Sequence, residues 1–127
     1  MTDTFGGDHP NTALCYESIG IIYRYKGKQD TALQYFNKAL SIIALKLGNT
    51  NRSTSYLYNE IGLIYVKKGW YRRSIMYYKK GLTIQANIYP KKHPYIGLKY
   101  NNIGTVHQFT GEYDKAISYY KKAVTNY

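Results

Sequence analysis

Apolar residues recur along the chain at the spacing of amphipathic helices. In the segment 53–88 a first series is spaced by three and four residues, which places it on one helix face: Tyr58, Ile61, Gly62, Tyr65 and Val66. Lys67-Lys68-Gly69 then places positive charge and a glycine where a helix should end. A second series begins after Trp70-Tyr71 and runs to Ile88. Because few residues separate the two series, we predict two antiparallel helices packed as a hairpin.

This unit occurs three times with a period of 42 residues, anchored by Ile19-Gly20, Ile61-Gly62 and Ile103-Gly104. Each anchor is followed by a second glycine seven residues later: Gly27, Gly69 and Gly111. A fixed period of this length indicates a repeat architecture whose units stack on one another. The pattern predicts an all-α chain with helices at 11–26, 29–47, 53–68, 71–88, 95–110 and 113–126.

Two further repeated features concern helix geometry. The anchor glycine lies inside a helix, where glycine costs about 1 kcal/mol relative to alanine. Its recurrence therefore indicates that a neighbouring helix approaches closely at Gly62.

The pairs His9-Pro10 and His93-Pro94 precede the first and fifth helices, where proline fits a helix start, so we interpret both histidines as caps.

The three units resemble the tetratricopeptide repeat (TPR) family. That family's pattern of an aromatic, Leu-Gly, tyrosine, then alanine, aromatic and alanine is matched in the first unit by Tyr16, Ile19-Gly20, Tyr23, Ala32, Phe36 and Ala39. The second unit has Tyr58, Ile61-Gly62, Tyr65, Ser74, Tyr78 and Gly81, and the third has Tyr100, Ile103-Gly104, His107, Ala116, Tyr120 and Ala123. The resemblance implies a right-handed superhelical solenoid of three antiparallel helix hairpins, with repeats at about 9–50, 51–92 and 93–127.

The period and two short strings resemble one subtype of the family. The usual family period is 34, whereas 42 residues, His93-Pro94 and Tyr100-Asn101-Asn102-Ile103-Gly104 are similar to the kinesin light chain subtype. In that subtype, asparagines of the first helices line a concave groove and hold an extended peptide by its backbone. The resemblance therefore implies exposed groove residues at these positions: Asn59, Asn101, Asn102, Tyr25, Leu63, Lys67, Thr105 and Phe109. The lysine-rich clamp of other TPR proteins is not evident, since Glu17 and Ile21 occupy its positions.

The function expected from these features is a non-catalytic adaptor or scaffold that binds a protein or peptide partner. The formal net charge of +11 and 17 tyrosines leave an alternative open, a basic helical-repeat protein that binds RNA or another nucleic acid. The basic residues are spread along the chain except for a cluster in the middle unit, which we expect to be solvated, with alkyl stems covering tyrosines: Lys67, Lys68, Arg72, Arg73, Lys79 and Lys80.

Other functional classes find little support in the sequence. The seven carboxylates form no acid–base pair, and no phosphate loop or His-Cys arrangement occurs, so we predict no enzyme, catalytic residue, cofactor or metal site. Cys15 has no partner for an intrachain disulfide and is expected to be a small apolar filler. Without an apolar run long enough for a bilayer or a signal-peptide pattern, the expected location is cytoplasmic, away from membranes.

The last predicted helix carries many apolar groups, among them Tyr113, Ile117 and Val124. A solenoid buries each hairpin against the next, and a terminal unit needs a polar or covered outer face. We therefore expect the single domain 1–127 either to belong to a longer array or to self-associate through its last hairpin.

Overall fold

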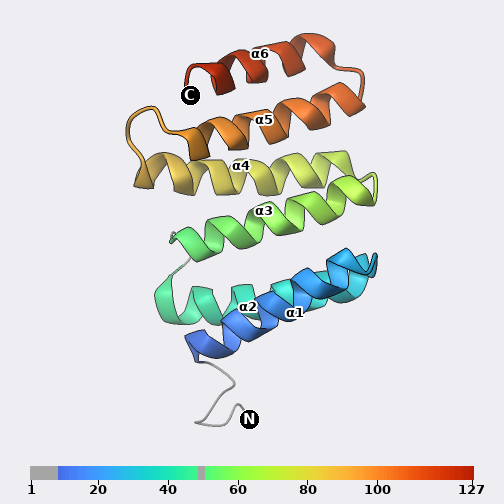
Figure 1. Ribbon diagram of the computed structural model, residues 1–127, viewed down its shortest axis with the longest axis vertical. Coiled ribbons are helices and arrows are strands. Elements are labelled where there is room, and N and C mark those ends of the chain that lie inside the picture. Colours follow the sequence, from blue (N-terminus) through green and yellow to red (C-terminus); the bar gives the residue numbers. More distant parts are fainter. Residues whose placement is uncertain (1–8, 49–50) are drawn as a thin grey trace.

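The structure, a computed structural model, describes residues 9–48 and 51–127. This part of the chain contains six helices and no strand: α1 Pro10–Tyr25, α2 Gln29–Leu47, α3 Arg52–Lys67, α4 Tyr71–Ile88, α5 Pro94–Phe109 and α6 Tyr113–Val124. The three helix hairpins stack in chain order along the longest dimension of the molecule (Figure 1). The predicted helices are confirmed. The bounds of α2 and α4 agree, those of α1, α3 and α5 lie one residue earlier than predicted, and α6 ends two residues early, with Thr125 as its C-cap.

Side-chain caps explain where the first helix of each hairpin begins. The Nδ1 atom of His9 accepts a hydrogen bond from the backbone N–H of Asn11, and that of His93 accepts one from Tyr95, at 3.0 and 3.1 Å. In the middle unit, the Oδ1 atom of Asn51 accepts from the N–H of Thr54 at 3.1 Å. Each bond satisfies one of the free N–H groups of a helix start, so the capping role predicted for the two histidines is confirmed.

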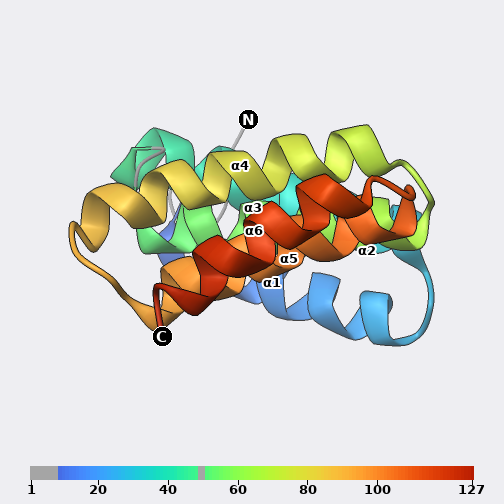
Figure 2. The same ribbon diagram turned by 90° about the horizontal axis from the view of Figure 1, so that it is seen from above.

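The glycine after each first helix makes the turn into the second. Gly27, Gly69 and Gly111 have φ of 79°, 78° and 80°, the left-handed region that glycine adopts without steric cost. The turn reverses the chain within a few residues, and the two helices of each hairpin then pack along their length. Figure 2, which views the stack from above, shows the helix axes lying roughly along one direction.

The anchor glycines bring the two helices of each hairpin into close contact. A Cβ atom on Gly20, Gly62 or Gly104 would lie 2.7, 2.7 or 2.9 Å from a ring carbon of Phe36, Tyr78 or Tyr120, respectively. No real Cβ atom tolerates such a contact with a packed ring. The recurring glycine is therefore a packing requirement, as the sequence predicted.

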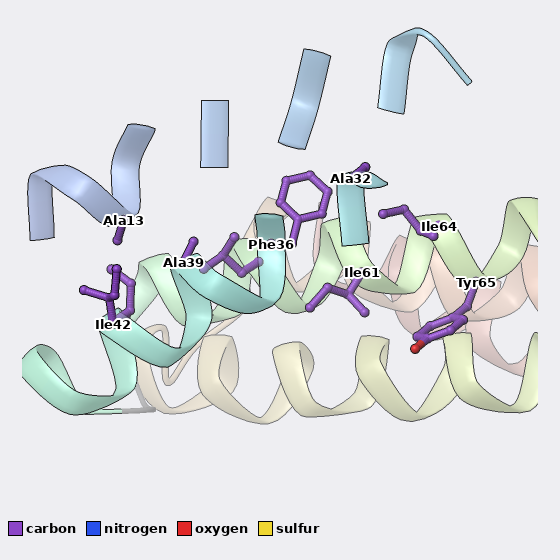
Figure 3. Packing of buried hydrophobic residues seen from close by; sticks show 10 residues of the cluster. Ala13, Ala32, Phe36, Ala39, Ile42, Ile61, Ile64 and Tyr65 are labelled. Carbon is purple, nitrogen blue, oxygen red and sulfur yellow. The ribbon is translucent and has the colours of Figure 1, made fainter. Parts of the chain in front are cut away.

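The core runs continuously from the first hairpin into the second. Phe36 of α2 is completely buried, and so are Ile61 and Ile64 of α3, which belong to the same cluster (Figure 3). A second cluster joins Tyr78 of α4 to Ile103 and Val106 of α5. The helices α2 and α3 pack together, as do α4 and α5, while the first hairpin makes no substantial contact with the third. This arrangement is an open stack of neighbours and not a closed bundle.

The prediction for Cys15 is wrong, because this side chain is exposed on α1. The equivalent positions in the next two units are Leu57 and Lys99, both buried. Those two residues lie on first helices that are covered by the hairpin before them, whereas no described helix precedes α1. The same position in the repeat is therefore a core position only in the second and third units.

Candidate peptide-binding site

The first helices of successive hairpins, α1, α3 and α5, touch one another only through single side-chain contacts, and together they are called the first-helix face here. Between α1 and α3, the Nε atom of Arg24 lies 2.9 Å from Oε2 of Glu60, and both side chains are largely buried. The two atoms are close but not aligned for a hydrogen bond, so the contact is an electrostatic pair. Glu17 adds a second carboxylate here, and burial together with the charge of Glu60 raises its pKa.

Between α3 and α5 the contact is made by two amides. The Nδ2 group of Asn102 donates to Oδ1 of Asn59 at 3.0 Å, and both side chains are half-buried. The remaining donor and acceptor atoms of these amides are left for other partners. Both residues line a pocket between the second and third hairpins.

This pocket has a volume of about 540 Å³ and is bounded by three helices. From α3 come Arg52, Tyr56 and Asn59, from α4 and its C-cap Gln85 and Tyr89, and from α5 Tyr95, Leu98, Lys99 and Asn102. Four of these side chains are apolar or aromatic and five carry polar or charged ends. Such a mixture of an apolar lining with a few converging polar groups is typical of ligand pockets.

Two positive charges line the pocket. Lys99 is only 8% exposed, and burial lowers its pKa to about 8, with the nearby carboxylate of Glu60 acting in the opposite direction. Glu60 is engaged with Arg24, and no carboxylate of the described residues lies within ion-pair distance of Lys99. Arg52 lies at the rim, with its guanidinium 5.3 Å from the ring centre of Tyr89. The pocket therefore presents a buried positive charge that forms no ion pair with any carboxylate of the described residues.

Gln85 supplies an unpaired acceptor to the same pocket. Its Oε1 atom is buried and has no hydrogen-bond partner among the described residues. A buried acceptor without a partner costs about 1–3 kcal/mol, so a donor entering the pocket would gain by binding there.

The residues expected in the groove divide into two groups. Asn59 and Asn102 line the pocket, but they are half-buried and bonded to each other, whereas Asn101 is exposed outside it. The other five lie nearer the hairpin turns and do not line the pocket: Tyr25, Leu63, Lys67, Thr105 and Phe109.

Two of these five side chains contact helices other than their own. Thr105 is half-buried, with Oγ1 3.1 Å from the hydroxyl of Tyr120 in α6, and the Phe109 ring lies 6.1 Å from that of Tyr71 in α4. Tyr25 and Lys67 are exposed, and Leu63 is half-buried.

Sequence reasoning missed the pocket residues Arg52, Gln85, Tyr89 and Lys99. One signal for Lys99 was available in the sequence, because a lysine stands there where the preceding unit has the core residue Leu57.

A second repeated feature lies along one edge of the hairpins. In each unit a lysine of the second helix lies 5.0–5.7 Å from the ring centres of two tyrosines: Lys38 with Tyr16 and Tyr35, Lys80 with Tyr58 and Tyr77, and Lys122 with Tyr100 and Tyr119. Tyr35, Tyr77 and Tyr119 are also stacked on Tyr23, Tyr65 and His107. Each of these rings already carries an aromatic partner and a cation.

The middle unit extends this edge with its only tryptophan. The Trp70 ring stacks on Tyr65 with 5.7 Å between centres, and Lys68 and Arg73 lie 5.0 and 5.1 Å from it. Of the predicted basic cluster, only Lys68 is half-buried, and it pairs with Asp30; the other five are exposed. The cluster is therefore mostly exposed, as expected, and the atoms that lie near the Trp70 ring are the charged ends of Lys68 and Arg73.

His107 is buried, stacks on Tyr119, and its Nδ1 atom lies 3.1 Å from Oε1 of Glu112. Within residues 9–48 and 51–127 no three His, Cys, Asp or Glu side chains come together in a way that could hold a metal ion. The described helices also include none that is long and apolar enough to cross a membrane.

The stacked hairpins define a helical-repeat solenoid. The model of the tetratricopeptide repeat family matches residues 1–44 and 53–127. The chain therefore belongs to this family, as its repeat motifs predicted.

Solved structures agree in fold. BtubC (BKLC) from P. vanneervenii superposes with a TM-score of 0.87 at 19% identity, over 94% of this chain and 48% of that one. A kinesin-light-chain-like protein of Podosopora anserina with nearly identical TPR-like repeats gives 0.76 at 18% identity, over 92% and 56%. The second TPR of Spaghetti (RPAP3), bound to the HSP90 peptide SRMEEVD, gives 0.67 at 16%, over 91% and 92%. No curated protein matches the sequence.

These likenesses confirm the solenoid fold. The chain spans about half the length of the BtubC and Podosopora chains, so it corresponds to only part of each.

Proposed function

We propose that this chain is a non-catalytic adaptor module that binds an extended peptide along its first-helix face. The pocket between α3 and α5 receives an acidic side chain or a terminal carboxylate of that peptide. The observation that carries the proposal is Lys99, a buried lysine that lines the pocket and has no carboxylate partner among the described residues.

Charge and hydrogen bonding support this choice of ligand. At neutral pH a lysine with a pKa of about 8 is still mostly protonated, and an incoming carboxylate compensates the buried charge. Arg52 at the rim adds a second cation, and the unpaired Oε1 of Gln85 can accept a backbone N–H of the peptide. The free amide atoms of Asn59 and Asn102 can pair with the peptide backbone in the same way.

One solved relative offers a parallel. The second TPR of Spaghetti is bound to the peptide SRMEEVD, which contains two glutamates and an aspartate. In this chain the carboxylate is proposed to meet Lys99 and Arg52.

The test is an array of immobilised heptapeptides in which every carboxylate-bearing sequence has an amide counterpart, with SRMEEVD and SRMQQVN as one pair. We expect the chain to retain carboxylate peptides over their counterparts. The variant Lys99→Leu should lose this preference, since removing a charge-assisted bond costs about 1.5–3 kcal/mol, roughly tenfold or more in affinity. Lys79→Leu is the matched control, because Lys79 is exposed and lies outside the pocket.

The nucleic-acid alternative predicts a different result. Single-strand binders stack bases on free aromatic faces, and their affinity falls steeply with salt. The second-helix tyrosines here already carry a stacked ring and a lysine, which counts against that function. Retention of single-stranded RNA with a steep salt dependence, together with no carboxylate preference on the array, would replace the peptide proposal with the alternative.

A further inference from the structure

The outer face of α1 repeats positions that are buried elsewhere in the stack. Ile19 and Ile22 are 38% and 59% exposed. Their counterparts one and two periods later are Ile61 and Ile64 in α3 and Ile103 and Val106 in α5, each at most 1% exposed. In α3 and α5 these positions pack against the second helix of the preceding hairpin. The α1 face is therefore one complete half of the inter-hairpin interface.

The outer face of α6 carries the other half. In α4, Tyr71, Ile75 and Leu82 are partly buried in the cluster that contains Ile103 and Val106 of α5. The positions 42 residues later are Tyr113, Ile117 and Val124, which are 65%, 51% and 70% exposed. Both halves of an interface that the fold uses twice internally are thus present on one chain, and their apolar side chains are exposed in the part that the structure describes.

Polar and aromatic contacts between hairpins have matching counterparts on these two faces. Asp30 of α2 pairs with Lys68 at the end of α3. Lys26, at the end of α1, occupies the position of Lys68 one period earlier. Asp114, in the first turn of α6, occupies the position of Asp30 two periods later. The carboxylate and the ammonium of this contact are therefore repeated on opposite ends of the molecule.

The ring contact between α4 and α5 is repeated as well. Tyr71 and Phe109 lie 6.1 Å apart between ring centres, and their counterparts on the end faces are Tyr113 and Tyr25, which are both exposed. The apolar, aromatic and charged residues of the α6 and α1 faces therefore all match when the two faces are aligned in the register that the internal hairpins use.

We propose that copies of this chain stack head to tail, with the α6 face of one copy on the α1 face of the next. Ile117 and Val124 then cover Ile19 and Ile22 of the second copy, Tyr113 meets Tyr25, and Asp114 pairs with Lys26. The two faces differ, so the contact is heterologous and leaves one free face of each kind at the ends of any assembly. The assembly therefore grows with concentration into an open chain of copies that continues the solenoid.

Sedimentation velocity of the full chain tests the proposal. We expect the mean mass of the parent chain to rise steadily with concentration, beyond that of a dimer. Ile22→Lys blocks the α1 face and Ile117→Lys blocks the α6 face, so each variant alone should sediment as a monomer. Met76→Lys is the control, since Met76 and its counterparts Gln34 and Ser118 are exposed in all three units. Circular dichroism should show the same helix content in all four proteins.

Mixing the two blocked variants provides the decisive measurement. Ile22→Lys keeps an intact α6 face and Ile117→Lys an intact α1 face, so an equal mixture should form a 1:1 dimer and nothing larger. A parent chain that is monomeric at every concentration, a mixture that stays monomeric, or association that Ile117→Lys abolishes and Ile22→Lys leaves intact would each overturn the proposal.

A charge exchange provides a second test that spares the apolar core. Lys26 and Asp114 are exposed, so Asp114→Lys and Lys26→Asp should fold normally. Asp114→Lys should weaken association by placing like charges opposite each other, and adding Lys26→Asp in the same chain should restore it. Unchanged association in Asp114→Lys would contradict the register.

Discussion

A methyl group on Gly62 would lie 2.7 Å from the Cε1 atom of Tyr78. The two residues belong to the two helices of the middle hairpin, and Tyr78 is itself buried, which raises its pKa to about 12. The ring therefore rests directly on the backbone of α3. The contact sets how closely the helices approach, and the other two hairpins repeat it.

Gly62→Ala should destabilise the chain, although alanine favours helix. The clash exceeds the gain in propensity of about 1 kcal/mol, and overpacking a core typically costs about 1–3 kcal/mol. Urea denaturation measures the free energy of unfolding. In the double variant with Tyr78→Leu the smaller side chain should relieve the clash, so the two effects should not add. Strict additivity would show that the ring can move aside at no cost.

Lys99→Leu should stabilise the chain at neutral pH while it weakens carboxylate binding. Burial lowers the pKa of Lys99 from 10.5 to about 8, so the folded state holds this proton more weakly than the unfolded chain does. At neutral pH the substitution should raise the free energy of unfolding by about 1–3 kcal/mol, since a pKa that is lower by one in the folded state corresponds to about 1.4 kcal/mol.

The pH dependence separates this explanation from simple repacking. In the parent chain, the cost of the buried charge disappears as pH rises from about 8 to 10.5, so its stability should approach that of Lys99→Leu over this range. Comparing parent and variant by chemical denaturation cancels the titration of the tyrosines. A gap that stays constant between pH 7 and pH 10.5 would mean that Lys99 is not buried as a charge.

Glu112 should stabilise the third hairpin turn above its ordinary titration range. Hydrogen bonds from Lys115, His107 and Thr110 lower the pKa of its carboxyl from 4.5 to about 2. The stabilisation is therefore fully present above pH 4.5 and is lost as pH falls toward 2. The melting temperature of Glu112→Gln should be lower than that of the parent at neutral pH, and the difference should shrink through this window. A difference independent of pH would contradict the charged hydrogen bonds as its cause.

His93→Ala should lower the free energy of unfolding by about 0.5–2 kcal/mol, the usual cost of losing an N-cap. His93→Asn should recover most of this loss, because Asn51 caps α3 through its own side chain. Thermal unfolding of the three proteins makes the comparison. If His93→Asn proves as unstable as His93→Ala, the stacking of the His93 ring on Tyr89, with 3.9 Å between centres, is the larger contribution.

The sequence was sufficient to predict the six helices because the starts of the first helices and the turns that follow them are marked by local residues. His9, Asn51 and His93 mark starts, and Gly69 and its equivalents mark the turns. The pocket depends on how two hairpins meet, which the period alone does not specify. Lys99 occupies a core position, but its burial and its lack of a carboxylate partner follow from the positions of α3 and α4 around it.

The groove asparagines show the same limit. Asn59 and Asn102 could be placed on the first helices from the repeat, and both do line the pocket. That they bond to each other could not be foreseen, because Asn59 and Asn102 occupy neighbouring and not identical positions in the repeat. The prediction that Cys15 is buried was wrong for a related reason. The equivalent positions in the other units, Leu57 and Lys99, are buried because a preceding hairpin covers them.

The stacking of Trp70 on Tyr65 gives the chain an internal optical probe. As the only indole among 17 tyrosines, it is the single acceptor for their excitation energy and emits from one known place, the turn of the middle hairpin. Lys68 and Arg73 beside the ring make its emission sensitive to local charge as well. Opening of that turn can thus be followed in the unlabelled protein by fluorescence, separately from the overall loss of helix recorded by circular dichroism.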